Sequence, residues 1–207
     1  MATVGLRDLF RAPITPAAEG KETYGKPVRM AKAIEADLSV TTAEAILYAD
    51  DSIDEIEKEF VSGEVKLKVN DLTPADLAAV LGMKQDDDGV VYGGEMDDPP
   101  YFAIGFRAKK AGGKYKYVWL YKVKFAIPND KYVTKGDKLE FNTPEITGKF
   151  TKRDDGYWKA EHVGAIDEPV SKSWFETVRE PRIEPETPDP DPDPDGDNGS
   201  GDGTNNP

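Results

Sequence analysis

The sequence predicts a mainly β protein, with a β-sandwich or barrel-like body, one short flanking α-helix, an extended N-terminal arm and a disordered acidic C-terminal tail. Three observations favour this class. Apolar residues alternate with polar ones in several short segments, helical periodicity is scarce, and Ile183 is the only large apolar residue after position 180. One β domain is therefore expected over residues 1–180, followed by an Asp- and Pro-rich tail or linker over residues 181–207.

A period of two indicates the strands. Apolar side chains occupy alternate positions in residues 34–40 and 64–70, as they do in half-buried strands. The longest such pattern covers residues 114–125, where lysines and an apolar middle share one face. The other face of this segment is aromatic and is expected to be core: Tyr115, Tyr117, Trp119, Tyr121, Val123 and Phe125.

Turn residues place the remaining strands. Ala-Gly-Gly at 111–113 would join the longest strand to residues 101–108 as a β-hairpin. Alternation predicts three further strands, at 138–142, 145–151 and 157–163. With these strands the body has enough sheet to form a sandwich or barrel.

Helix signals are few. Thr73 is a suitable N-cap, Pro74 stands at the first helical position and Gly82 ends the apolar face, so a short helix is predicted between them. Residues 171–178 are a second candidate helix. Residues 52–61 fit two patterns, a helix that begins with a capping box or the first strand of a hairpin, and periodicity alone does not decide between them.

The composition restricts the classes of function. Lys and Arg number 27 against 40 Asp and Glu, giving a formal net charge of −13; the tail, with eight carboxylates against Arg182, carries −7 and the body −6. This charge opposes binding to nucleic acid phosphates. The chain has no cysteine, which excludes disulfides and thiolate metal sites. Because it has no signal-peptide pattern and no apolar run of about 20 residues, we expect synthesis and folding in a cytoplasm and no membrane partner.

Catalytic and metal-binding patterns are weak. His162 is the only histidine and is expected to be structural, and the sequence has no nucleophile elbow, phosphate loop or histidine-rich metal motif. Pro192 and Pro194 oppose the one calcium-loop spacing in the tail, because each keeps the preceding aspartate extended. That spacing comprises Asp191, Asp193, Asp195, Gly196 and Asp202. We expect a protein that is not an enzyme and that holds no cofactor or metal.

The order of several motifs resembles a known family. An acidic element, YADD at 48–51, precedes FVSGEVKLKVNDL at 60–72, which holds a turn glycine, an alternating strand and an Asp-Leu pair before a short helix. Three further motifs agree with this order: VGLRDL at 4–9, YGKP at 24–27 and YKYVWLYK at 115–122. Over residues 1–180 the chain thus resembles the major tail proteins, or tail tube proteins, of long-tailed non-contractile bacteriophages.

The resemblance implies a structural virion protein that assembles in the host cytoplasm as hexameric rings stacked into a tail tube. It implies tape-measure, tail-terminator and tail-tip proteins as partners, and DNA that passes through the tube without specific binding. It also favours a hairpin that turns at Ser62-Gly63. Residues 41–63 then form an inter-ring loop, mobile in the monomer, whose contact residues are Asp50, Asp51, Ile53, Ile56 and Phe60.

Two alternatives remain open. The same subunit could build the tube of a bacteriocin-like or defective-phage particle, which carries no genome. A carbohydrate-binding β-sandwich would instead use Trp119, Trp158 and Trp174 as a stacking platform for its ligand.

Overall fold

The computed structural model describes residues 3–15, 22–49, 52–129 and 143–182. It confirms the mainly β class and contains two short helices. The strands are β1 (Thr3–Thr15), β2 (Thr23–Tyr24), β3 (Val28–Arg29), β4 (Ala33–Ala49), β5 (Ser52–Val69), β6 (Lys84–Gln85), β7 (Val91–Tyr92), β8 (Tyr101–Lys110), β9 (Tyr115–Phe125), β10 (Glu145–Thr151) and β11 (Lys159–Gly164). The helices are α1 (Pro74–Leu81) and α2 (Pro169–Lys172).

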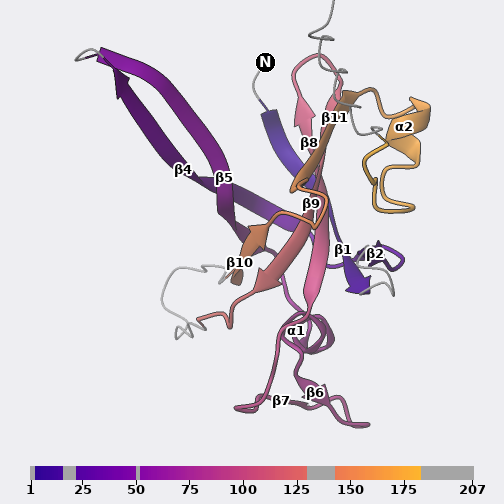
Figure 1. Ribbon diagram of the computed structural model, residues 1–207. Helices are drawn as coiled ribbons and strands as arrows, with labels where there is room; N and C mark the ends of the chain where they lie inside the picture. The colour runs from indigo at the N-terminus through magenta and orange to yellow at the C-terminus, as the bar shows by residue number, and fades with distance from the viewer. Residues whose placement is uncertain (1–2, 16–21, 50–51, 130–142, 183–207) are drawn as a thin grey trace, which may run out of the picture.

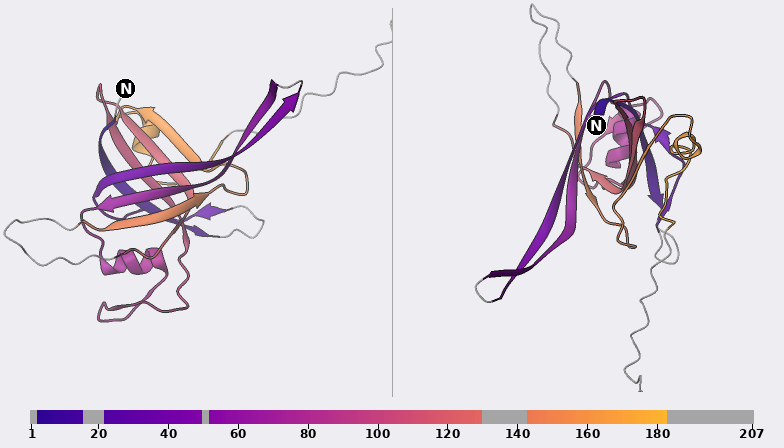
Figure 2. Two further views of the ribbon diagram at one scale, coloured as in Figure 1. Left: turned by 90° about the vertical axis from the view of Figure 1, so that its left-hand side faces the viewer. Right: turned by 90° about the horizontal axis from the view of Figure 1, so that it is seen from above.

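One antiparallel sheet of nine strands forms the body. Its order is β2-β1-β8-β9-β10-β5-β4, with β11 paired to β9 and β3 paired to β1, while β6 and β7 form a separate small hairpin. The sheet curls back on itself, so that β4, β5 and β10 cross over β1, β8 and β9 (Figures 1 and 2). The expected hairpin between β8 and β9 is present.

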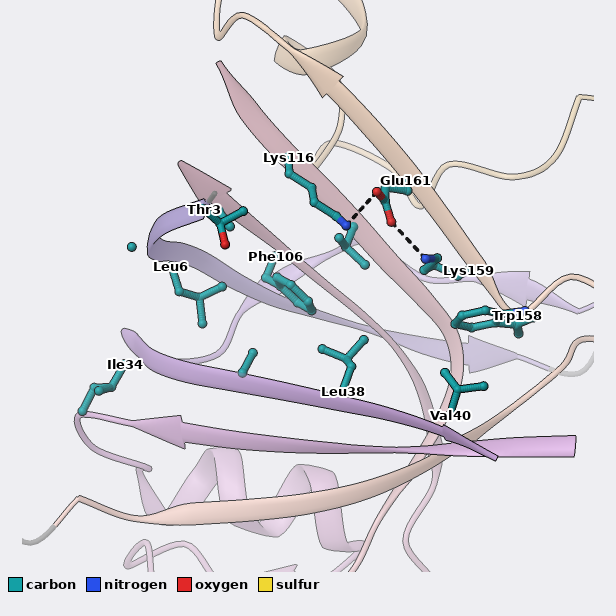
Figure 3. A pocket seen from close by; sticks show the side chains of 14 residues that line it. Thr3, Leu6, Ile34, Leu38, Val40, Phe106, Lys116, Trp158, Lys159 and Glu161 are labelled. Atoms are coloured by element: carbon teal, nitrogen blue, oxygen red, sulfur yellow. Dashed lines mark hydrogen bonds and ion pairs between the residues drawn. The ribbon is translucent and has the colours of Figure 1, made fainter. Parts of the chain in front are cut away.

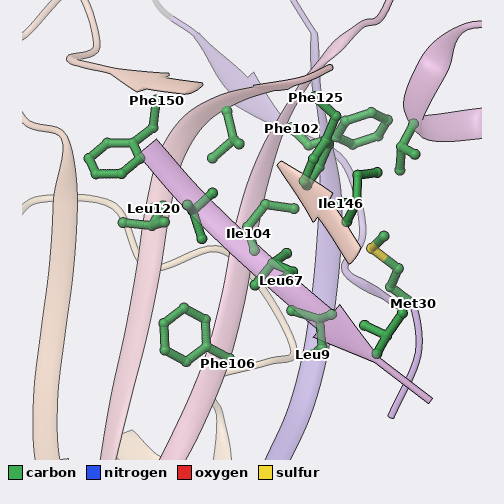
Figure 4. Close-up of a cluster of buried hydrophobic side chains, with 14 of the residues drawn as sticks. Leu9, Met30, Leu67, Phe102, Ile104, Phe106, Leu120, Phe125, Ile146 and Phe150 are labelled. Carbon is green, nitrogen blue, oxygen red and sulfur yellow. The ribbon is translucent and has the colours of Figure 1, made fainter. Parts of the chain in front are cut away.

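A large apolar core fills the space between the two crossing parts of the sheet (Figure 4). β5 contributes alternate residues, as its period of two predicts, and β8, β9 and β10 face them. The buried members of this core are Leu9, Met30, Val65, Leu67, Val69, Val80, Leu81, Phe102, Ile104, Phe106, Val118, Leu120, Val123, Phe125, Ile146 and Phe150.

A second core lies on the opposite face of β8 and β9. Tyr117, Trp119 and Tyr121 are at most 1% exposed, which confirms them as core residues. The C-terminal segment that contains α2 covers them, and the Trp119 indole Nε1 donates a hydrogen bond of 3.0 Å to the carbonyl oxygen of Trp174. β9 is therefore buried on both faces, and its apolar middle points into the large core rather than toward solvent.

The expected alternation of β9 fails beyond Tyr121. Val123 and Phe125 belong to the large core, not to the core of Tyr121. The reason is a register shift against β8: Phe102 pairs with Val123, but Ile104, two positions on, pairs with Leu120. The extra residue in β9 is a β-bulge, which turns the following side chains to the other face.

The first helix agrees with its capping signals. The Thr73 hydroxyl accepts a hydrogen bond of 3.1 Å from the Asp76 amide, Pro74 occupies the first turn, and Gly82 ends the helix with φ of 70°. The second prediction, a helix over 171–178, is wrong in its bounds. α2 begins at Pro169 and ends at Lys172, and turns follow it.

The N-terminal prediction needs correction. The segment is extended, but it is not a free arm, because β1 pairs with β8 from Thr3 to Pro13 within the sheet. The predicted strand 138–142, the calcium-loop spacing and nearly all of the proposed tail lie outside the described residues. Within the described part of the chain, neither helix is long and apolar enough to cross a membrane.

Arg153 fixes the last described segment against the body. This side chain is buried, its guanidinium lies 5.2 Å from the centre of the Tyr121 ring, and it forms an ion pair of 3.8 Å with Glu180. The Tyr121 hydroxyl donates a hydrogen bond of 2.7 Å to the carbonyl oxygen of Arg179. Burial raises the pKa of Tyr121 to about 12 although the nearby Arg153 lowers it, so the hydroxyl stays a donor at neutral pH.

Candidate functional site

The hairpin of β4 and β5 extends far beyond the body (Figures 1 and 2). The two strands pair from Ala33 and Val69 to Ala49 and Ser52, whereas β10 accompanies β5 only as far as Gly63. All described side chains of residues 41–48 and 52–59 are exposed. We call residues 41–61 of this hairpin, as far as they are described, the arm.

The arm settles one expectation and corrects another. Residues 52–61 are a hairpin strand, the alternative that the resemblance favoured over a helix. Ser62-Gly63 is not a turn, because β5 runs through it. A Cβ atom at Gly63 would overlap the ring of Phe150, so packing and not turn geometry requires glycine there. Beside it, the register shifts and leaves Val61 without a partner in β4. This β-bulge marks the point where the arm leaves the body.

The two faces of the arm differ in chemistry. Ile46 pairs with Ile56 and Tyr48 with Ile53, so these four side chains share one face, with exposed fractions between 40 and 65%. We call these four residues the arm patch. The opposite face carries three carboxylates, paired with small or apolar residues of β4: Glu55, Glu57 and Glu59. Over residues 41–61 the sequence has seven carboxylates against Lys58, a net charge of −6.

The predicted contact residues fall at different places on this hairpin. Ile53 and Ile56 belong to the arm patch, whereas Phe60 is half-buried at the root of the arm, where its ring stacks on Trp158 with centroids 4.8 Å apart. Asp50 and Asp51 lie outside the described residues. A two-stranded ribbon gains little stability by itself, and an exposed apolar patch on it is typical of a surface that contacts another molecule.

An open slot lies beside the root of the arm, between β4 and the strands β1, β8, β9 and β11 (Figure 3). It is a cavity of about 530 Å³. Its wall is mainly apolar and includes Leu6, Leu38, Phe106 and Val118. Along β4 the wall is incompletely covered, since Ile34 and Val40 remain 49% and 46% exposed. The slot is thus an opening through which the large core meets solvent.

Three charged side chains border the slot on the side of β9 and β11. The Glu161 carboxylate accepts from the Nζ atoms of Lys116 and Lys159, at 2.7 and 2.9 Å (Figure 3). Burial raises the pKa of Glu161, but the hydrogen bonds and charges of the two lysines outweigh burial, and the pKa lies below its ordinary value. These groups give this side of the slot a net charge of +1.

A basic turn continues the slot at one end. The β8–β9 hairpin has five cations and no carboxylate over residues 107–116. By alternation Lys110 shares the face of Phe106, and Lys114 shares the face of Lys116 and Val118, which is the face that lines the slot. We call Lys110, Lys114 and the residues between them the basic turn. Among the described residues, neither Lys110 nor Lys114 takes part in an ion pair.

The other candidates from the sequence do not form a chemical site. His162 is partly buried and stacks on Tyr117 and Trp174, which is the structural role expected of it. The described part of the chain contains no group of three or more metal-ligating side chains. The tryptophan platform is wrong, because Trp119 and Trp174 are buried and Trp158 packs on Phe60. The slot was not expected. The signal for it in the sequence is the spacing of Lys114, Lys116 and Val118, which alternate along the strand and therefore share one face.

No protein-family model matches this chain, and no curated protein sequence matches it either.

Proposed function

We propose that this protein is a structural subunit that assembles as stacked hexameric rings into a bacteriophage tail tube. The observation that carries the proposal is the arm, with its exposed apolar patch. An exposed hairpin of this kind is unfavourable in an isolated monomer, since it presents Ile46, Tyr48, Ile53 and Ile56 to water. Contacts with neighbouring subunits would cover the patch.

The sheet edges support the same proposal. In the described residues β4 is hydrogen-bonded only to β5, and β11 only to β9, so each strand has one edge without a strand partner. Such edges pair readily with strands of other chains and are an aggregation hazard unless assembly covers them. A closed ring of identical subunits gives every such edge a neighbour.

The charge of the chain suits a conduit. The body, residues 1–180, has a net charge of −6, which would let a genome pass along the tube without adhering to it. The proposed partners are other copies of the chain, together with tape-measure, tail-terminator and tail-tip proteins, and the proposed location is the virion. A subunit of a bacteriocin-like or defective-phage tube would use the same arm and edges, and it is the second candidate.

Assembly of the purified protein tests this function. The full chain, concentrated at neutral pH with EDTA, should form rings or tubes visible by negative-stain electron microscopy, and large species in sedimentation velocity. EDTA belongs in the sample because the proposal needs no metal ion. A sample that stays monomeric at millimolar concentration, with and without co-expressed tape-measure and tail-tip proteins, would contradict the proposal.

A matched pair of variants controls for non-specific association. Ile46→Asn/Ile56→Asn removes half of the arm patch and should prevent assembly. Val90→Asn changes a residue of similar exposure, 48%, between β6 and β7 and should assemble like the unaltered chain. Equal effects of the two changes would show that general surface hydrophobicity, not the arm, drives association.

A further inference from the structure

The shape and lining of the slot fit a long, apolar occupant. Its volume of about 530 Å³ lies within the range of small-molecule pockets, about 300–1,000 Å³. However, it is open along the unpaired edge of β4, and the polar groups that border it, Lys116, Lys159 and Glu161, already bind one another. An extended segment fits such an opening better than a compact ligand, because it covers an apolar strip and reaches a strand edge at the same time.

Charge restricts the occupant further. The net charge of +1 beside the slot, together with Lys110 and Lys114, which form no ion pair within the described residues, favours a segment whose end is acidic. Within the described residues, the arm is the exposed extended segment that combines an apolar patch with carboxylates. At its far end Asp54 and Glu55 stand between Ile53 and Ile56 in the sequence of β5: Asp54 has no partner in β4 at the register shift, and Glu55 lies on the face opposite the arm patch.

The arm cannot enter the slot of its own chain. Val40 lines the slot and stands immediately before the arm, and β4 and β5 stay paired from there to Ala49 and Ser52. The arm leads away from the body along this whole length (Figures 1 and 2). To reach its own slot, the hairpin would have to fold back at its root and break that ladder.

We propose that the slot is the receptor for the arm of a second copy of this chain. The arm patch of one subunit covers the apolar wall of the slot in the next, and the negative charge of Asp54 and Glu55 at the far end of the arm lies near Lys110 and Lys114 of the basic turn. This inference rests on the proposed function, for which it names the surface that receives the arm. Arm and slot are different surfaces, so the contact is heterologous and repeats from copy to copy, as a ring or tube requires.

A charge exchange tests the contact. The arm variant is Asp54→Lys/Glu55→Lys, and the turn variant is Lys110→Glu/Lys114→Glu; all four positions lie outside both cores. Each variant should remain folded by circular dichroism and should need at least about tenfold more protein to assemble, because each places like charges at the contact. A chain that carries both changes should assemble at the concentration of the unaltered protein.

Mixing shows whether the contact joins two copies. At a concentration at which neither assembles alone, the arm variant and the turn variant should assemble when mixed in equal amounts, because the arm of each species then meets positions 110 and 114 of opposite charge on the other species. Lys84→Glu, on the separate β6–β7 hairpin, is the matched control and should leave assembly unchanged. Recovery in the doubly changed chain without recovery in the mixture would overturn the assignment to a second copy.

A disulfide provides a second readout. The natural chain has no cysteine, so Ile53→Cys/Ile34→Cys places one thiol on the arm patch and one at the lip of the slot. Mild oxidation of assembled protein should give a ladder of covalent multimers, whereas Ile53→Cys/Val90→Cys should not. If the unaltered chain never assembles, the proposed function fails. If it assembles but the turn variant behaves normally or no ladder forms, only the arm-and-slot contact is refuted.

Discussion

Shortening the arm should abolish assembly without affecting the fold. Ala43 and Glu59 are directly paired, so replacing residues 44–58 by Asn-Gly would close the hairpin with a two-residue turn. The described side chains in this stretch are exposed, and the Lys58–Glu44 ion pair of 3.0 Å is removed as a whole. Surface changes of this kind alter the free energy of unfolding by no more than about 1 kcal/mol.

The loss of assembly is much larger. Full burial of an Ile or similar side chain is worth about 1.5–3 kcal/mol. About half of each side chain in the arm patch is still exposed, which leaves about 1 kcal/mol for each of the four and roughly 4 kcal/mol for the patch. The association constant of each arm contact should therefore fall about a thousandfold.

Two measurements separate these effects. Urea unfolding of the shortened and the complete chain, both as monomers, should give midpoints that agree closely. Sedimentation velocity at rising concentration, with electron microscopy of the pellets, should show rings or tubes for the complete chain only. Assembly of the shortened chain at the same concentration, or a body that unfolds at a much lower midpoint, would refute the reasoning.

Four further predictions concern single features. Trp119→Ala should lower the free energy of unfolding by about 3–5 kcal/mol, and an unchanged urea midpoint would contradict its place in the core. Gly63→Ala should lower the free energy of unfolding by about 1–3 kcal/mol, and Phe150→Leu in the same chain should recover part of this loss. No recovery in the double variant would contradict a clash between the added Cβ and the Phe150 ring. Because the pKa of folded Glu161 is below its ordinary 4.5, its stabilisation is present above that pH and is lost as the pH falls through the lower value. Glu161→Gln should therefore differ from the unaltered chain in urea melts at pH 7 and converge with it in acid. Truncation before Pro185 should leave tube diameter unchanged, and loss of tubes would make the tail an inter-subunit contact.

Local chemistry was sufficient to predict several elements of the fold. The bounds of α1 could be predicted from Thr73, Pro74 and Gly82, because helix capping depends on residues that are close in the sequence. Likewise, the burial of Tyr117 and Trp119 could be predicted, because alternation within one strand places them on a common face. The β8–β9 hairpin follows in the same way from the glycines of its turn.

Long-range packing explains where the sequence was misleading. The ring of Phe150 requires Gly63, yet in the sequence Ser62-Gly63 looks like a turn. Val123 changes face because of a bulge that only the register against β8 reveals. The slot depends on strands that are distant in the chain, from Thr3 to Glu161, and no local pattern brings these together.

The place of β1 in the sheet imposes an order on folding during synthesis. Asp8 and Arg107, which form a hydrogen bond between β1 and β8, are 99 positions apart. At about 5–20 residues per second, β1 waits roughly 5–20 s for its partner strand, while a hairpin such as β4–β5 forms within about 10 μs of leaving the ribosome. The arm is consequently among the first elements to form, and the slot, which also needs β11, is among the last. A nascent chain can offer its arm early, but under the proposed contact only a finished subunit can accept one.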